Sequence, residues 1–151
     1  RLSNGIISNL IKDENELRKD TLDYIFDNEK LAKQFLAAFW DAEGTVLYQK
    51  EKKYYSLYLY NSNETILEKV KEFLNKKSIK FSVHSRKTRD KQYVLNNHII
   101  KSKKALHRIN IHKSSWLTWL NEIGLNLNHT KKKEMVNNLK RYLGGKLKWV
   151  R

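Results

Sequence analysis

The 151-residue sequence contains no cysteine and no proline. Without cysteine, a disulfide framework and a thiolate metal site are both excluded. The sequence also lacks any apolar run close to the roughly 20 residues that a membrane-spanning helix needs, so no membrane partner is expected. No signal peptide is visible, although the chain begins at Arg1 rather than at Met. A single globular domain in a cytosolic or organellar interior suits this composition.

Acidic residues are few in this sequence, and they are fewest in one segment. The chain has 31 Lys and Arg against 16 Asp and Glu, a formal net charge of +15. Residues 76–113 contain 12 basic residues and a single acid, Asp90. A positive field this concentrated attracts a polyanion, and the segment lacks the amphipathic pattern of a membrane-surface helix. Nucleic acid is therefore the expected partner, and a solvated lysine-rich surface is the alternative.

Hydrophobic periodicity predicts an α+β fold in which residues 1–26 are an N-terminal helical extension and residues 27–151 are one domain. In the domain, helices are expected over residues 27–44, 61–74, 115–123 and 130–143, and strands over residues 45–50, 54–60, 79–86 and 106–112. Asp27 and Asn61 are expected as helix N-caps, and Gly44 as a left-handed helix stop. The last helix is expected to end at Gly144 and Gly145. Residues 87–104 form a long basic loop or an extended hairpin.

The four strands are expected to form a mostly antiparallel sheet with the helices on one face, which leaves the other face open. Alternation along the strands places polar and basic side chains on this open face. They are Gln49, Ser56, Tyr58, Tyr60, Lys80, Ser82, His84, Arg86, Arg108, Asn110 and His112, and Lys87 and Arg89 follow in the basic segment. Long polar side chains across a sheet suit the major groove of DNA, where each base pair offers a distinct set of donors and acceptors.

The first helix of the domain ends in the sequence Leu36-Ala37-Ala38-Phe39-Trp40-Asp41-Ala42-Glu43-Gly44. This segment resembles the LAGLIDADG motif of the homing endonucleases and their maturase relatives, with Ala38 in place of Gly and Glu43 in place of the second Asp. The hairpin behind the motif and the αββαββα order extend the resemblance over about residues 27–143. The resemblance implies a DNA-binding saddle formed by the sheet.

Small residues in the motif indicate a second copy of the chain. Ala38 and Ala42 lie four residues apart on one side of the helix, so another helix can approach closely there. Because the motif occurs only once, the matching surface is expected from a second subunit in a two-fold homodimer. Asp41 is expected to hold the helix end and the dimer geometry. Burial of the two alanines against the chain's own sheet is the alternative.

Two carboxylates, Asp41 and Glu43, lie in the last helical turn, where the helix dipole disfavours negative charge. A divalent cation offsets that penalty, and Mg²⁺ (or Mn²⁺) binds through one or two carboxylates together with phosphate oxygens and water. The resemblance implies that Glu43 binds the metal, with the Ala42 carbonyl near it. It also implies that Asn61 orients a water molecule. The alternative role for the Asn61 side chain is to cap the following helix.

The resemblance further implies a basic catalytic residue near the end of the fourth strand. Both His112 and Lys113 match that place. Strand parity favours His112 for the DNA face, whereas the ammonium group of Lys113 is better suited to stabilise charge in the transition state. Lys113 is the preferred choice.

These observations predict a homodimeric, Mg²⁺-dependent endonuclease that cuts both strands of a long, near-palindromic DNA site. As the resemblance implies, it would be encoded in an intron and would work where the DNA is, in a prokaryotic cytoplasm or an organelle matrix. One alternative is an RNA-splicing maturase, which would bind intron RNA. The other is a non-catalytic DNA-binding regulator, and the acid at position 43 argues against this second alternative only.

Overall fold

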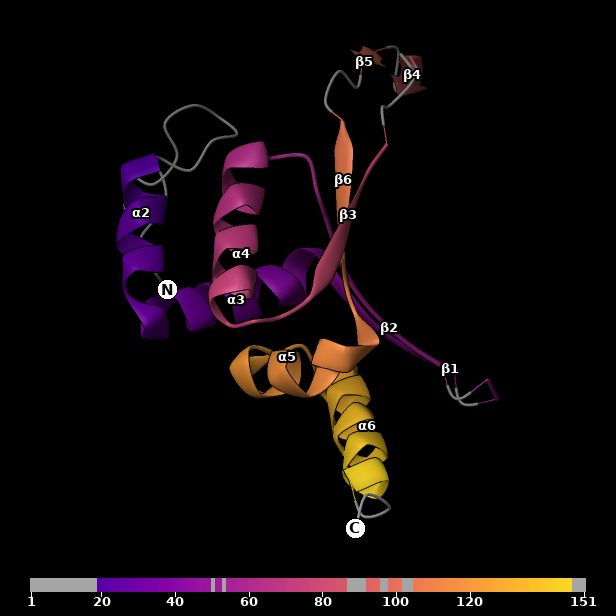
Figure 1. The fold of residues 1–151 in the computed structure, drawn as a ribbon. Helices are drawn as coiled ribbons and strands as arrows, with labels where there is room; N and C mark the ends of the chain where they lie inside the picture. Colours follow the sequence, from indigo (N-terminus) through magenta and orange to yellow (C-terminus); the bar gives the residue numbers. More distant parts are fainter. Residues whose placement is uncertain are drawn as a thin grey trace.

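Four antiparallel strands form the sheet at the centre of the computed structural model (Figure 1). Their order is β1 (Gly44–Gln49), β2 (Tyr54–Asn61), β6 (Leu106–Ile111) and β3 (Phe81–Arg86). Two further strands, β4 (Gln92–Leu95) and β5 (His98–Lys101), pair with each other between β3 and β6 in the chain, so the backbone here is a hairpin. The predicted α+β class and the αββαββα order are confirmed.

The structure describes residues 19–49, 51–52, 54–86, 92–95, 98–101 and 105–147. Most of the expected N-terminal extension and two predicted DNA contacts, Lys87 and Arg89, lie outside these residues. Within the described part of the chain, no helix is both long and apolar enough to cross a membrane.

The helices cover one face of the sheet. They are α2 (Lys19–Asp27), α3 (Glu29–Glu43), α4 (Glu64–Lys76), α5 (Trp116–Glu122) and α6 (Thr130–Leu147), with short 3₁₀ turns at Lys113–Ser115 and Gly124–Asn126. Helix α2 packs against α3 and α4, and its Leu22 is fully buried. Helix α6 contacts β1 and continues through Gly144 and Gly145, so the prediction that it ends there is wrong.

Strand alternation divides the sheet into a core face and an open face. Val46, Leu57, Leu59, Ile109 and Ile111 point toward the helices and are almost completely buried. The strand register pairs Val46 with Leu57 and Leu59 with Ile109, so these side chains stack across neighbouring strands. The residues between them face away from the helices, as the alternation predicts.

The helix caps differ by one or two residues from the prediction. Asn28, not Asp27, caps α3 by accepting a hydrogen bond from the Leu31 amide at 3.1 Å. Asp27 is instead the last residue of α2. Asn63 caps α4, whereas Asn61 is still part of β2.

Gly44 is not the left-handed stop that the sequence predicts, because its backbone is extended (φ −90°, ψ 164°) and begins β1. Glycine is required here for space. A Cβ atom on Gly44 would lie 2.2 Å from Cδ1 of Trp40. The Trp40 indole is fully buried and packs edge-on against Trp119, with 5.2 Å between the ring centroids. The tight connection from α3 to β1 therefore requires a residue without a side chain at position 44.

Ion pairs link the N-terminal end of α3 to the ends of α4 and α5. The Glu29 carboxylate pairs with Lys77 at 2.6 Å and with Lys33 at 3.0 Å, and Lys33 also pairs with Glu122 at 2.8 Å. The hydrogen bonds from Lys77 and Lys33 lower the pKa of Glu29 from 4.5 to about 2. This network therefore depends on Glu29 being ionised.

Candidate active site and nucleic-acid interface

Helix α3 has a buried side and an uncovered side. Ala32, Leu36 and Trp40 are buried against the rest of the domain. Ala38 and Ala42 are exposed. The alternative that these two alanines pack against the chain's own sheet is therefore wrong, and the described residues leave them uncovered.

Glu43 is the last residue of α3, and the next residue begins β1, so its exposed carboxylate lies where the helix meets the sheet. Among the described residues, no hydrogen bond or ion pair engages this carboxylate. A free carboxylate is the oxygen ligand that Mg²⁺ prefers, and one or two suffice when phosphate oxygens and water complete the shell. No cluster of three or more His, Cys, Asp and Glu occurs in the part of the chain that the structure describes. The residues thus fit an open metal site rather than a closed one.

The start of α6 and the loop before it hold the end of α3. Asp41 Oδ2 accepts a hydrogen bond from the Asn128 amide at 2.6 Å. Lys132 Nζ donates to the carbonyl oxygens of Trp40 and Asp41, at 2.9 and 2.6 Å. We call these contacts the α6 clamp. Asp41 thus joins the end of α3 to the loop before α6 of the same chain, and its expected role in the dimer stays a prediction.

Lys132 is not among the site residues predicted from the sequence. Burial lowers the pKa of its ammonium group, while the nearby Asp41 and Glu43 carboxylates act in the opposite direction. The ammonium therefore lies within the field of Glu43 and caps the negative end of the helix. The run Lys131-Lys132-Lys133 at the start of the last helix is the signal in the sequence, but nothing in it distinguishes the middle lysine.

Strand register places Asn61 near Glu43. Gly44 pairs with Leu59, so Asn61 at the end of β2 lies level with the end of α3. Its Oδ1 accepts a hydrogen bond from the Asn63 amide at 2.7 Å, which supports the start of α4. The side-chain amide NH₂ has no partner among the described residues.

The structure does not bring His112 and Lys113 to Glu43, which corrects the expectation. Strand β6 runs antiparallel to β2, and Asn61 pairs with His107 near the beginning of β6. Lys113 follows six residues later, about 20 Å along an extended chain. The end of β6 therefore lies beside the start of β2, away from the end that carries Asn61.

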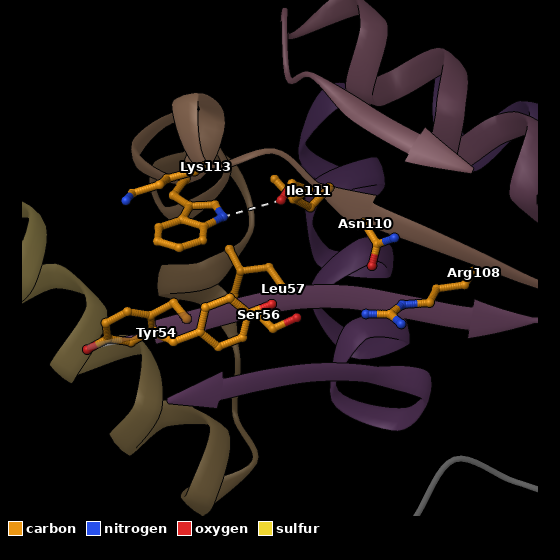
Figure 2. A pocket seen from close by; sticks show the side chains of 9 residues that line it. Tyr54, Ser56, Leu57, Arg108, Asn110, Ile111 and Lys113 are labelled. Atoms are coloured by element: carbon orange, nitrogen blue, oxygen red, sulfur yellow. Dashed lines mark hydrogen bonds between the residues drawn. The ribbon is translucent and has the colours of Figure 1, made fainter. Parts of the chain in front are cut away.

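Lys113 instead lines a cavity of about 420 Å³ (Figure 2). The cavity opens where β2 and β6 separate beyond the Tyr58–Asn110 pair. Its other lining residues are Tyr54, Tyr55, Ser56, Leu57, Arg108, Asn110, Ile111 and Trp116. Figure 2 shows Lys113 and Arg108 at opposite ends of it, while the Trp116 indole NH donates to the Ile111 carbonyl at 3.3 Å. The cavity has buried apolar walls and a rim with two cations.

The open face of the sheet carries the polar residues that strand alternation predicts. Gln49, Ser56, Tyr58, Tyr60, Ser82, His84, Arg86, Arg108 and Asn110 share this face by register. Lys80 directly precedes β3. The guanidinium of Arg108 lies over the Tyr58 ring at 4.1 Å and near the Tyr60 ring at 5.5 Å. The face thus combines hydrogen-bonding groups with positive charge.

Comparison with known proteins identifies the family. The family model described as a LAGLIDADG-like domain matches residues 30–124, more than half of the chain. No curated protein matches. A solved structure described as a mesophilic variant of the homing endonuclease I-DmoI is 20% identical, with a TM-score of 0.45, and the match covers 70% of this chain and 45% of that one. The chain therefore spans less than half the length of that endonuclease. On the family match, it belongs to the LAGLIDADG homing-endonuclease family.

Proposed function

We propose that this chain is a site-specific, double-strand DNA endonuclease that acts as a homodimer. One observation carries the proposal: the exposed carboxylate of Glu43 lies where the uncovered side of α3 meets the sheet with the open polar face. Members of the family bind and cut DNA, and the concentrated positive charge of this chain suits the same polyanion. An intron-encoded origin and a compartment that contains DNA belong to the same proposal.

The dimer is proposed from the uncovered side of α3. Ala38 and Ala42 are small enough for a second α3 helix to approach closely, and the half-buried rings of Phe35 and Phe39 flank them. A two-fold axis beside these alanines would bring two Glu43 residues near each other. Each carboxylate would then serve one DNA strand.

In the proposed mechanism, the open face of each sheet holds half of the duplex site. Glu43 and the Ala42 carbonyl would hold Mg²⁺ or Mn²⁺, which when bound activates water and stabilises charge on phosphate oxygens. The α6 clamp keeps the last turn of α3 in place, so the Glu43 carboxylate keeps its position relative to the scissile phosphate. The amide NH₂ of Asn61, which has no partner among the described residues, is available to orient a water molecule.

Glu43→Gln tests the proposal. The purified chain is incubated with a duplex library of random sequence in Mg²⁺ or Mn²⁺, and cut molecules are recovered and sequenced. We expect wild type to cut a restricted set of sequences, and Glu43→Gln to cut none while binding the same set within about threefold, because the sheet supplies most of the affinity. Glu72→Gln, an exposed acid on α4, is the matched control and should cut normally. If wild type cuts no member of the library, or if Glu43→Gln still cuts, the proposal is wrong.

A further inference from the structure

Arg108 on the open face is held by two aromatic rings. Its guanidinium carbon lies 4.1 Å from the centroid of the Tyr58 ring and 5.5 Å from that of Tyr60. The two rings meet edge to face at 5.3 Å, and Tyr60 pairs with Arg108 across β2 and β6. Arg108 is thus the only cation within reach of two rings among the residues that the structure describes.

The two rings leave only part of the guanidinium available to a ligand. The Nε atom of Arg108 is buried and has no hydrogen-bond partner in the described structure. Stacking on an aromatic ring keeps a guanidinium plane in one orientation without using its terminal NH₂ groups. Arg108 therefore presents a planar donor group whose direction is fixed before DNA arrives.

The register places this group close to the proposed cleavage centre. Gly44, Leu59 and Ile109 form one row across β1, β2 and β6, and Arg108 is one residue from that row. Two strand spacings separate β1 from β6, so the Arg108 backbone lies roughly 10 Å from the start of β1. A base contacted by Arg108 would belong to the part of the site near the scissile phosphate.

We infer that Arg108 recognises one guanine in each half of the DNA site, and that Tyr58 and Tyr60 orient it for that contact. Guanine offers two adjacent acceptors, O6 and N7, in the major groove, and arginine can donate to both at once. This inference rests on the proposed function. The competing role is a phosphate contact, which would add affinity for every sequence equally.

A binding selection separates the two roles. The full chain selects duplexes from a random library in EDTA, so that no strand is cut, and the bound sequences are read. We expect wild type to select guanine at one position of each half-site. Arg108→Ala should lower the preference for that guanine by about 5- to 150-fold, the range for one bidentate contact, and leave the other positions unchanged. Arg108→Lys should lower it as well, because lysine keeps the charge and loses the planar donor pair.

Three further variants test the role of the rings and of charge alone. Tyr58→Leu should weaken the guanine preference, whereas Tyr58→Phe should retain it because the ring remains. Arg141→Ala removes an exposed arginine from helix α6, outside the open face of the sheet, and it should leave that guanine preference intact. Circular dichroism and thermal unfolding establish that each variant is folded.

The outcomes distinguish this inference from the proposed function. If Arg108→Ala weakens binding to all sequences equally, Arg108 is a phosphate contact and the inference is overturned, while site-specific binding stands. The inference is also overturned if wild type enriches a site in which no guanine depends on Arg108. If wild type enriches no sequence at all, both the inference and the proposed function fail.

Discussion

Replacing Lys132 by methionine removes the cation of the α6 clamp and keeps most of the side chain's length. Two hydrogen bonds from a charged donor contribute about 1.5–3 kcal/mol each, and a cation at a helix C-terminus adds about 0.3–1 kcal/mol. Against this, ordering a lysine side chain costs about 2 kcal/mol. The burial that lowers the Lys132 pKa shows that its ammonium also loses hydration. We therefore expect the free energy of unfolding to fall by about 2 kcal/mol.

Thermal and urea unfolding measure this loss. For a chain of this size, about 2 kcal/mol corresponds to a fall in Tm of roughly 4–8 °C. Lys131→Met and Lys133→Met, both exposed neighbours on α6, are matched controls and should stay within about 0.5 kcal/mol of wild type. Under the proposed function, Lys132→Met should also slow cleavage by about 10- to 100-fold, the range for residues that orient a metal ligand. If Lys132→Met unfolds like its two neighbours, the clamp does not hold α3.

Three other predictions follow from the helices. Ala38→Leu should shift the protein toward monomer in analytical ultracentrifugation, because a larger side chain separates the two α3 helices. Gly44→Ala should destabilise the fold by about 3 kcal/mol, since its Cβ would overlap the Trp40 indole, whereas Gly144→Ala, in open space within α6, should stabilise it by about 0.5–1 kcal/mol. Glu29→Gln should be less stable than wild type at neutral pH. That difference should disappear as the pH falls from 4.5 to about 2, because the lowered pKa confines the stabilisation by Glu29 to its ionised form.

Each of these predictions has a contradicting result. An unchanged sedimentation coefficient for Ala38→Leu would place the dimer contact elsewhere. Equal chemical stability of Gly44→Ala and Gly144→Ala would mean that the Trp40 indole moves easily. A difference between wild type and Glu29→Gln that is the same at pH 6 and pH 2.5 would show that its ion pairs do not stabilise the fold.

Features that depend on local periodicity were predictable from the sequence. The alternation Ser56, Tyr58, Tyr60 on β2 determines which side chains face away from the helices, and the observed register agrees with it. The buried residues of α4 likewise follow the helical spacing of apolar residues in the sequence: Ile66, Leu67, Val70, Phe73 and Leu74. These patterns operate over neighbouring residues, where backbone geometry alone determines which side each residue faces.

Features that depend on packing between distant segments were not predictable. Gly44 was expected to need a left-handed backbone, but the reason for glycine is the Trp40 indole, which is held by Trp119 from another helix. The resemblance implies a basic residue near the end of the fourth strand, and Lys113 is preferred over His112 there because of its ammonium group. The actual cation near the end of α3 is Lys132, whose place depends on how α6 crosses the domain. Spacing within the sequence gives no information on such a crossing.

The α6 clamp has a consequence for the order of synthesis. Asp41 and its hydrogen-bond partner Asn128 are 87 residues apart, and Lys132 follows the carbonyl groups that it caps by 91 and 92 residues. A ribosome therefore releases the motif helix long before it makes the residues that fix the end of that helix. Until α6 has left the exit tunnel, the helical turn that carries Glu43 lacks the contacts of the α6 clamp. The end of the motif helix therefore reaches its folded arrangement only after α6 has been made.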